Sequence, residues 1–216
     1  MSKRIGIFGG TFDPVHSGHL HAAKQIVSEL NLEQLNLVPA FKPVHRDVPS
    51  ANSAQRLEML SLATVGEDTL LVDSREVSRE GPSYSILTLK EYRAEHPDAM
   101  LYFIVGTDAI NQFDRWYEWQ SFLEYTNLVI LPRPGFKLDL HPKVAQAFET
   151  RWQTNLDDFK SAQSGQIYQS QQAMLTQSAT DFRNSLASEQ HARTMLHPSV
   201  YEYIREHKLY GKDLVE

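Results

Sequence analysis

The sequence has no cysteine, and its 216 residues include no apolar run near the ~18–20 residues that a membrane-spanning helix needs. Without cysteine the chain forms neither a disulfide nor a thiolate metal site, and it has no thiol nucleophile. The few residues before the first glycines are too short for a typical signal peptide. We therefore expect a cytoplasmic protein that does not bind membranes.

Positive charge is also scarce. The 21 Lys and Arg residues are outnumbered by 27 Asp and Glu residues, so the net charge is −6. A protein that binds nucleic-acid polymers without specificity needs a basic surface, so that class is disfavoured. The apolar fraction of 41% and the charged fraction of 22% are typical of globular proteins. We expect residues 1–216 to form a single domain, and the composition leaves a homo-oligomer open.

Short apolar segments alternate with segments whose apolar residues recur at helical spacing. This alternation predicts an α/β fold, a Rossmann-like, doubly wound and mainly parallel sheet. The expected strands are Arg4–Phe8, Leu35–Val38, Thr69–Asp73, Met100–Val105 and Asn127–Leu131. The expected helices are Ser17–Leu30, with Asn31 as its stop, Ser53–Ala63 and Tyr84–Glu95.

The last third of the chain is less regular. Residues 137–176 are interpreted as a surface elaboration, with a helix over Val144–Trp152 and a stretch rich in glutamine and serine. Residues 177–216 are expected to be a small helical C-terminal part. Its two helices are separated at His197–Ser199, where Pro198 suits the first turn of the second helix.

The stretch from Gly9 to His19 joins the first predicted strand to the first predicted helix. Ligands of open parallel sheets bind beyond the carboxyl ends of the strands, and a helix N-terminus presents unpaired N–H groups to anions. Gly9 and Gly10 let a ligand approach the backbone, and Gly18 leaves room beside the histidines. His16 and His19 share a face, so both can donate to phosphate oxygens as charge develops during phosphoryl or nucleotidyl transfer.

Other interpretations of these histidines stay open. His16, His19 and His21 are also compatible with a zinc site or with ordinary surface histidines. A zinc site is disfavoured because no fourth ligand lies at ligand spacing nearby. A dinucleotide-binding turn is disfavoured because the Gly-x-Gly-x-x-Gly pattern is absent.

Gly9–His19 resembles the nucleotidyltransferase superfamily with the His-x-Gly-His signature. Its members join a nucleoside triphosphate to a phosphate-bearing acceptor and release pyrophosphate. The resemblance implies that His16 and His19 are catalytic at the α-phosphorus and that Thr11 binds phosphate. It also implies that Gly9, Gly10, Phe12 and Gly18 belong to the ATP site.

A second superfamily motif is matched by Ser178–Arg183. Ser178 and Thr180 can cap a helix whose N–H groups face an anion, and Arg183 supplies a forked cation for phosphate. Read alone, the segment is an ordinary capped helix. The family usually has aliphatic residues where Gln177 and Phe182 stand.

Three further segments resemble the bacterial nicotinate-nucleotide adenylyltransferases, so that the resemblance covers nearly the whole chain. They are Pro82–Ser85, Gly106–Asp108 and Phe113–Trp119, with Arg133–Gly135 after them and Leu209–Tyr210 near the end.

The resemblance implies a role for residues in each segment. Gly106 and Asp108 belong to the ATP site, where Asp108 can accept hydrogen bonds from a ribose. Trp116 offers a flat face to a pyridinium ring. Ser85 and the backbone N–H of Tyr117 hold the ring carboxylate. His45 and Arg133 complete the acceptor site, although His45, Arg46 and Lys42 also fit solvated loop charges.

The resemblance predicts transfer of the adenylyl group of ATP to nicotinate mononucleotide. The products are nicotinate adenine dinucleotide and pyrophosphate. Mg²⁺ is expected to arrive with ATP, and no protein metal site is predicted. The alternatives are a related adenylyltransferase that uses nicotinamide mononucleotide or phosphopantetheine, and a nucleotide sensor without turnover.

Overall fold

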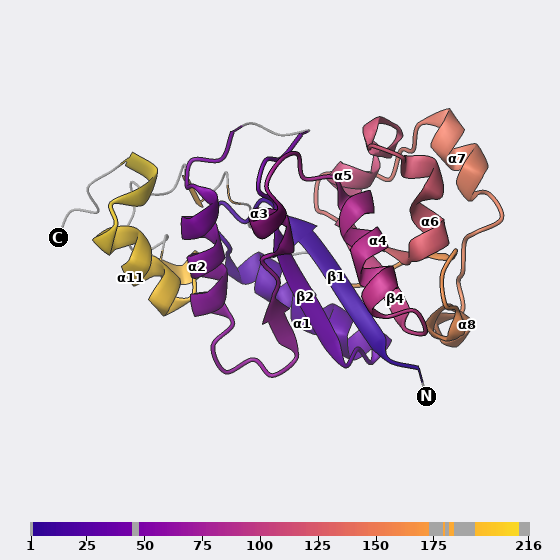
Figure 1. Ribbon diagram of the computed structural model, residues 1–216, viewed down its shortest axis with the longest axis horizontal. Coiled ribbons are helices and arrows are strands. Elements are labelled where there is room, and N and C mark those ends of the chain that lie inside the picture. Colours follow the sequence, from indigo (N-terminus) through magenta and orange to yellow (C-terminus); the bar gives the residue numbers. More distant parts are fainter. Residues whose placement is uncertain (1, 45–47, 173–178, 180–181, 184–192, 212–216) are drawn as a thin grey trace.

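The computed structural model describes residues 2–44, 48–172, 179, 182–183 and 193–211 (Figure 1). Its centre is a six-stranded sheet with the order β3-β2-β1-β4-β5-β6. All five strand pairings are parallel, which confirms the predicted α/β fold with a doubly wound parallel sheet. The strands are β1 (Arg4–Gly10), β2 (Gln34–Pro39), β3 (Leu70–Val72), β4 (Met100–Gly106), β5 (Asn127–Leu131) and β6 (Ile167–Gln169).

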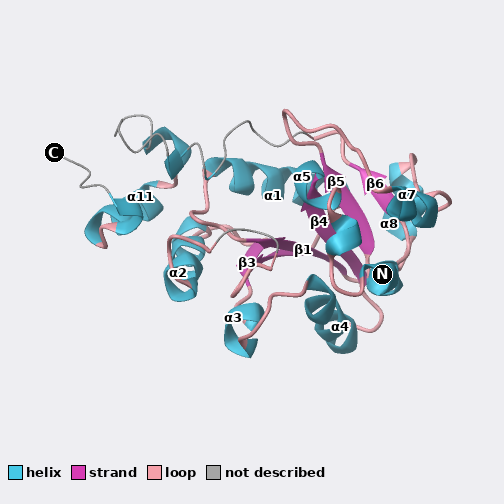
Figure 2. Cartoon of the chain, turned by 90° about the horizontal axis from the view of Figure 1, so that it is seen from above, coloured by secondary structure: helices cyan, strands magenta, loops and turns pink. Residues whose placement is uncertain are grey.

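Helices lie on both faces of this sheet. Figure 2 shows α1 on one side of the strands and α3 with α4 on the other. The described helices are α1 (Ser17–Leu30), α2 (Ser53–Ala63), α3 (Arg75–Arg79), α4 (Ser85–Glu95), α5 (Thr107–Ile110), α6 (Phe122–Tyr125), α7 (Pro142–Phe148), α8 (Leu156–Ser161) and α11 (Pro198–Glu206). Short 3₁₀ turns are η1 (Phe113–Arg115), η2 (Trp119–Ser121) and η3 (Leu209–Gly211).

The central strands are buried on both faces, as parallel strands covered by helices must be. Successive side chains of β4 alternate between two cores. Leu101 and Phe103 belong to the core that includes residues of α4, whereas Tyr102 and Ile104 belong to the core that includes residues of α1. This period of two explains why the strand reads as a continuous apolar run in the sequence.

Local signals set the helix boundaries. His16 has extended backbone angles and is the N-cap of α1, and Asn31 ends that helix in the left-handed conformation at φ 51°. Asn52 and Gln55 form a reciprocal capping box at the start of α2, with contacts of 2.9 and 3.0 Å. The predicted bounds of α1 and α2 are confirmed.

The structure corrects the interpretation of residues 137–176. Ile167–Gln169 is not surface elaboration, because it forms β6 and pairs with β5. The helix predicted over Val144–Trp152 is α7, which begins at Pro142 and ends at Phe148. Trp152 lies instead in an isolated bridge to Ile167, so its backbone is extended.

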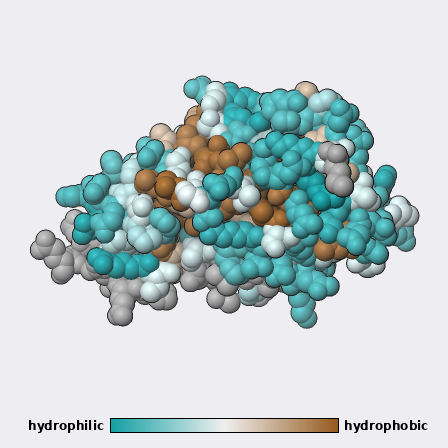
Figure 3. Space-filling view, turned by 90° about the horizontal axis from the view of Figure 1, so that it is seen from below, coloured by the Kyte–Doolittle hydropathy of each residue, from teal (hydrophilic) through white to brown (hydrophobic). Residues whose placement is uncertain are grey.

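The predicted C-terminal helix pair is described only in part. Pro198 occupies the first turn of α11, as expected from the sequence. Most of the preceding segment lies outside the described residues. Among the described helices none is long and apolar enough to cross a membrane. On the face shown in Figure 3, hydrophobic residues gather toward the middle and hydrophilic residues surround them.

Candidate active site

A cavity of about 1050 Å³ opens at the carboxyl ends of β1 and β4. The chain runs outward from β1 to β2 and β3, then crosses back to β4 on the other side of β1. This reversal of direction leaves a crevice between the loops that follow the two strands. The cavity therefore lies at the topological switch point, where ligands of open α/β sheets bind.

Most of the predicted site residues line this cavity. They come from the turn after β1, the start of α4, the end of β4 and the segments that follow. The residues are Gly9, Gly10, Thr11, Phe12, His16, His19, Ser85, Gly106, Asp108, Trp116, Tyr117, Arg133 and Arg183. Gly18 is buried in α1 and is not among the residues that line it. His45, Ser178 and Thr180 lie outside the described residues.

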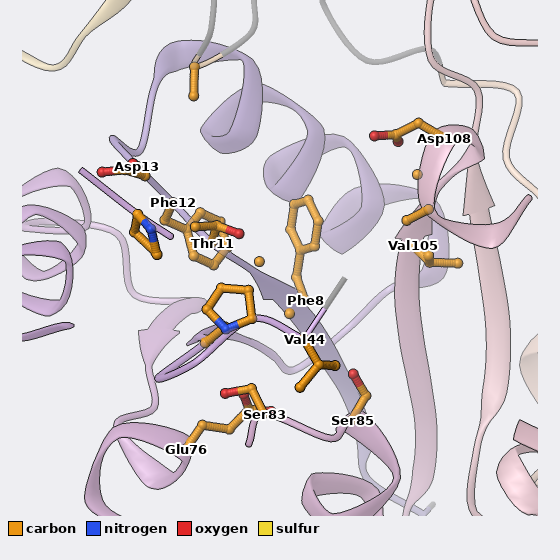
Figure 4. A pocket seen from close by; sticks show the side chains of 18 of the residues that line it. Phe8, Thr11, Phe12, Asp13, Val44, Glu76, Ser83, Ser85, Val105 and Asp108 are labelled. Carbon is orange, nitrogen blue, oxygen red and sulfur yellow. The ribbon is translucent and has the colours of Figure 1, made fainter. Parts of the chain in front are cut away.

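Three walls face one another across the cavity. Figure 4 shows Thr11 and Asp13 on one side, Ser83 and Ser85 with Glu76 on a second, and Asp108 beyond β4 on a third. The cavity is therefore wide enough to bring together groups from the turn after β1, the start of α4 and the start of α5.

The two histidines lie against each other at the start of α1, with ring centroids 3.7 Å apart. The backbone N–H of His16 donates to Nδ1 of His19 over 3.3 Å. A neutral imidazole that accepts at Nδ1 carries its proton on Nε2. His19 is thereby held as a hydrogen-bond donor from Nε2, which is the form that an anionic ligand requires.

Phe12 shapes the turn from within the core. Its side chain is only 2% exposed, and its ring packs edge-on against Phe8 and His19. A Cβ atom at Gly10 would lie 2.9 Å from this ring, so any larger residue there would force the ring to shift. Any contribution of Phe12 to phosphate binding therefore comes from the backbone.

Asp13 is a buried acceptor in the same turn. Its carboxylate accepts from the backbone N–H of Ser50 at 2.8 Å and of Ala51 at 3.0 Å, and from the Tyr210 hydroxyl at 2.9 Å. Arg183 donates to the Asp13 carbonyl at 2.6 Å. Asp13 thus links three segments by hydrogen bonds: its own turn after β1, the residues just before α2, and the second motif.

Arg56 holds the backbone around this turn. It lies on the buried face of α2 and is only 1% exposed. Its guanidinium donates to the carbonyls of Thr11 at 2.7 Å, Ala51 at 3.2 Å and Phe41 at 3.4 Å. Burial lowers the pKa of Arg56 while the charge of Asp13 opposes that shift, and an arginine remains protonated under such conditions.

A second buried carboxylate lies under the opposite wall. Glu76 is 6% exposed and accepts from the Thr88 hydroxyl at 2.7 Å. The Ser83 hydroxyl, which also interacts with Glu76, accepts from the backbone N–H of Phe41 at 2.8 Å. Burial raises the pKa of Glu76. This group connects α3, α4 and the loop after β2.

The wall of the cavity around Trp116 and Tyr117 is aromatic. Trp116 packs edge-on against Phe103 and Phe122 and also contacts Phe113, with ring centroids 5.1 Å apart. It is among the residues that line the cavity. Tyr117 is 49% exposed and stacks on Tyr84 with ring centroids 4.6 Å apart. A flat ligand ring would therefore meet a rigidly supported indole beside the start of α4.

Asp108 and Arg133 form an ion pair of 2.5 Å at the rim. The sequence interpretation assigned Asp108 to the ATP ribose and Arg133 to the acceptor, as separate groups. In the structure Arg133 donates directly to Asp108. The two predicted subsites therefore meet at this pair.

Known proteins are similar to this chain over nearly its full length. A family model described as cytidylyltransferase-like matches residues 7–185. A probable nicotinate-nucleotide adenylyltransferase of Chromobacterium violaceum is 40% identical over 214 residues, which covers 97% of this chain and 100% of that protein. One of Hydrogenovibrio crunogenus is 37% identical and covers 97% of this chain and 98% of that protein.

The chain belongs to the nicotinate-nucleotide adenylyltransferase family. Among solved structures, a nicotinic acid mononucleotide adenylyltransferase of Plasmodium falciparum complexed with NaAD has the same fold. The TM-score is 0.75 at 20% identity, and the match covers 96% of this chain and 97% of that chain.

Four groups around the site of this adenylyltransferase-family protein were not singled out from the sequence: the buried Asp13, Arg56 and Glu76, and the half-buried Tyr210. Arg56 shares the helical face of Met59, Leu60 and Ala63, so a charged residue on an apolar stripe was an available signal. Asp13 lies inside the recognised turn. No local pattern distinguishes Glu76, because its partners come from other elements.

In the described part of this family member, no three His, Asp or Glu side chains are grouped so that they could hold a metal ion. Asp13, in the turn after β1, already accepts hydrogen bonds from protein donors. Asp108, at the start of α5, does so as well.

Replacing Glu76 by glutamine is expected to change how stability depends on pH. Because burial raises the Glu76 pKa, the folded state holds its proton more tightly than the unfolded chain does. The stabilisation from this group is complete below its unfolded pKa of about 4.3 and is lost as pH rises through the folded pKa.

Denaturant unfolding at several pH values from about 4 to about 7 measures this effect. The unfolding free energy of the wild type, minus that of Glu76→Gln, should fall as the pH increases. Glu33→Gln, at an exposed carboxylate, serves as the control and should give a difference that depends less on pH. A difference for Glu76→Gln that stays constant would contradict the prediction.

Proposed function

We propose that this protein transfers the adenylyl group of ATP to nicotinate mononucleotide, forming nicotinate adenine dinucleotide and pyrophosphate in NAD biosynthesis. The observation that carries the proposal is one continuous cavity. It joins the His16–His19 pair and Arg183 to the aromatic wall at Trp116. Membership of the adenylyltransferase family supports the same activity.

The acceptor 5′-phosphate attacks the α-phosphorus of ATP in line. A new P–O bond forms there, the bond from the α-phosphorus to the bridging oxygen breaks, and pyrophosphate leaves. The acceptor phosphate is already ionised, so the reaction needs no protein nucleophile. Catalysis then consists of positioning and charge stabilisation.

The phosphate side of the cavity supplies the donors. Nδ1 of His19 accepts from the His16 backbone, so in the neutral ring the proton lies on Nε2, which can donate to a phosphate oxygen. Arg183 donates to the Asp13 carbonyl, lines the same cavity and contributes a positive charge for the leaving pyrophosphate. We assign binding of the triphosphate to this side, together with Thr11 and the glycines of the turn.

The acceptor side of the cavity is suited to a charged aromatic ring. The indole of Trp116 can stack on a pyridinium. The start of α4 at Ser85 faces the cavity, and backbone N–H groups at a helix start favour a carboxylate. We assign the ring carboxylate to Ser85 and to the Tyr117 backbone, and the acceptor phosphate to the neighbourhood of Arg133.

Mg²⁺ enters this proposal as a companion of ATP. The described residues fit a cation bound by the triphosphate and water, since Asp13 and Asp108 are engaged with protein donors. When bound, the ion neutralises charge on the phosphates. The protein's own part is to hold the phosphates through donors rather than through carboxylates.

A pyrophosphate-release assay tests the proposal. The purified protein is given ATP with Mg²⁺ and, in separate reactions, nicotinate mononucleotide, nicotinamide mononucleotide or phosphopantetheine. We expect the highest kcat/KM with nicotinate mononucleotide. Preference for another acceptor would replace the substrate assignment, and release with none would favour a nucleotide sensor without turnover.

Replacing Trp116 by alanine is expected to raise the KM for the acceptor more than the KM for ATP. The physical reason is loss of the stacking face, worth about 1–2 kcal/mol, which corresponds to roughly 5–30-fold in acceptor affinity. Trp119→Ala is the matched control, because Trp119 packs on Phe113 but does not line the cavity. Equal changes in both KM values for Trp116→Ala would contradict the assignment.

A further inference from the structure

Tyr210 lies near the end of the described chain, yet its side chain contacts Asp13 in the turn after β1. It belongs to the 3₁₀ turn η3 that follows α11. Its hydroxyl donates to Oδ1 of Asp13 over 2.9 Å, across 197 positions of sequence. Burial and the nearby carboxylate of Asp13 raise the pKa of Tyr210, so the hydroxyl stays protonated and remains a donor.

The Tyr210 hydroxyl is one of the hydrogen-bond donors to the Asp13 carboxylate. Oδ2 of this carboxylate accepts from Ser50, and Oδ1 accepts from both Ala51 and Tyr210. The Asp13 side chain is only 7% exposed, so water is a poor substitute for a missing donor. Loss of the Tyr210 hydroxyl would leave a buried anion with fewer donors, which is energetically costly.

Tyr210 also meets the second phosphate motif by a separate route. Its ring packs edge-on against Phe182 with ring centroids 5.9 Å apart. Phe182 precedes Arg183, whose guanidinium donates to the Asp13 carbonyl at 2.6 Å and lies 3.7 Å from the Asp13 carboxylate. The Tyr210 side chain thus contacts both Asp13, which binds Arg183, and Phe182, which precedes Arg183 in the chain.

We propose that Tyr210 is a positioning residue for adenylyl transfer, acting through Asp13 and Phe182 to hold Arg183 beside the His16–His19 turn. The inference rests on the proposed function, because Arg183 is taken to stabilise the leaving pyrophosphate. It gives the C-terminal segment a part in the reaction although no atom of Tyr210 lines the cavity.

The chain contains a matched control for this contact. Tyr168 on β6 donates its hydroxyl to Glu29 on α1 over 2.8 Å, so it too is a tyrosine bonded to a carboxylate. Neither Tyr168 nor Glu29 lines the cavity. Tyr168→Phe removes the same type of bond at a distance from the site.

The test compares Tyr210→Phe with Tyr168→Phe in the full-length protein. Pyrophosphate release gives kcat and both KM values, and thermal unfolding gives Tm. We expect Tyr210→Phe to lower kcat about tenfold, the effect of one hydrogen bond to a charged group, with the acceptor KM unchanged. Tyr168→Phe should lower Tm similarly and leave kcat within about twofold.

A double-mutant cycle with Arg183→Lys tests the route. If Tyr210 acts through Arg183, the two substitutions together should cost less than the product of their separate effects on kcat. If Tyr210→Phe does not fold, Asp13→Asn in the same cycle provides the equivalent measurement. Fully multiplicative effects, or an unchanged kcat in Tyr210→Phe, would overturn the inference. A wild type that releases no pyrophosphate would instead contradict the proposed function.

Discussion

Replacing His19 by alanine should lower kcat about 10²–10³-fold at saturating ATP and Mg²⁺, which is the size expected for one transition-state donor. The Nε2 donor is oriented before any ligand binds, because Nδ1 accepts from the His16 backbone N–H at 3.3 Å and the two imidazole rings are in contact, with centroids 3.7 Å apart and planes tilted by 31°. A preoriented donor needs no reorganisation as charge develops on the phosphate oxygens. Its removal therefore acts on kcat more than on KM.

The control for this variant is His21→Ala. His21 lies two positions further along α1, is exposed and does not line the cavity. Steady-state pyrophosphate release should give wild-type kcat for His21→Ala. A fall of less than about threefold in His19→Ala would remove the transition-state role from this residue.

Replacing Arg56 by methionine should lower the free energy of unfolding by about 3–5 kcal/mol, the range for removing one member of a buried charged group. Methionine keeps the apolar stem but removes all the donors. The carbonyls of Thr11, Ala51 and Phe41 then lose their partner, and the buried Asp13 loses a nearby positive charge.

In a chain of this size that change corresponds to a Tm decrease of about 6–20 °C. Arg205→Met is the control, because Arg205 is 51% exposed on its side chain and pairs with Glu202 on the surface of α11. Exposed pairs contribute at most about 1 kcal/mol. Similar Tm values for Arg56→Met and Arg205→Met would show that the buried guanidinium is not an essential support of the turn.

The elements of the fold could be predicted where several sequence signals occur close together. β1, α1 and β2 follow from an apolar strand, a glycine-rich turn, a helical stripe and a stop at Asn31. β6 was not predictable, since it has three residues in a polar, glutamine-rich stretch and is defined by its pairing with β5. Helix α3 was missed for a similar reason, because five residues are too few to show a period.

The residues of the site also fall into those that could be predicted from the sequence and those that could not. Residues that a short motif brings together, such as His16 and His19, could be predicted to lie side by side before the fold was known. Buried supports could not, because their partners come from distant segments: Tyr210 meets Asp13, and Arg56 meets Thr11. Sequence spacing carries information about neighbours on one element, whereas these contacts depend on how several elements pack.

The outermost strands of the sheet, β3 and β6, are each only three residues long. A short edge offers few unpaired backbone groups to a strand from another molecule. Edge-to-edge addition between copies therefore gains only a few hydrogen bonds and is a poor route to aggregation. A contact between copies, where one forms, gains more from side-chain surfaces than from these two edges.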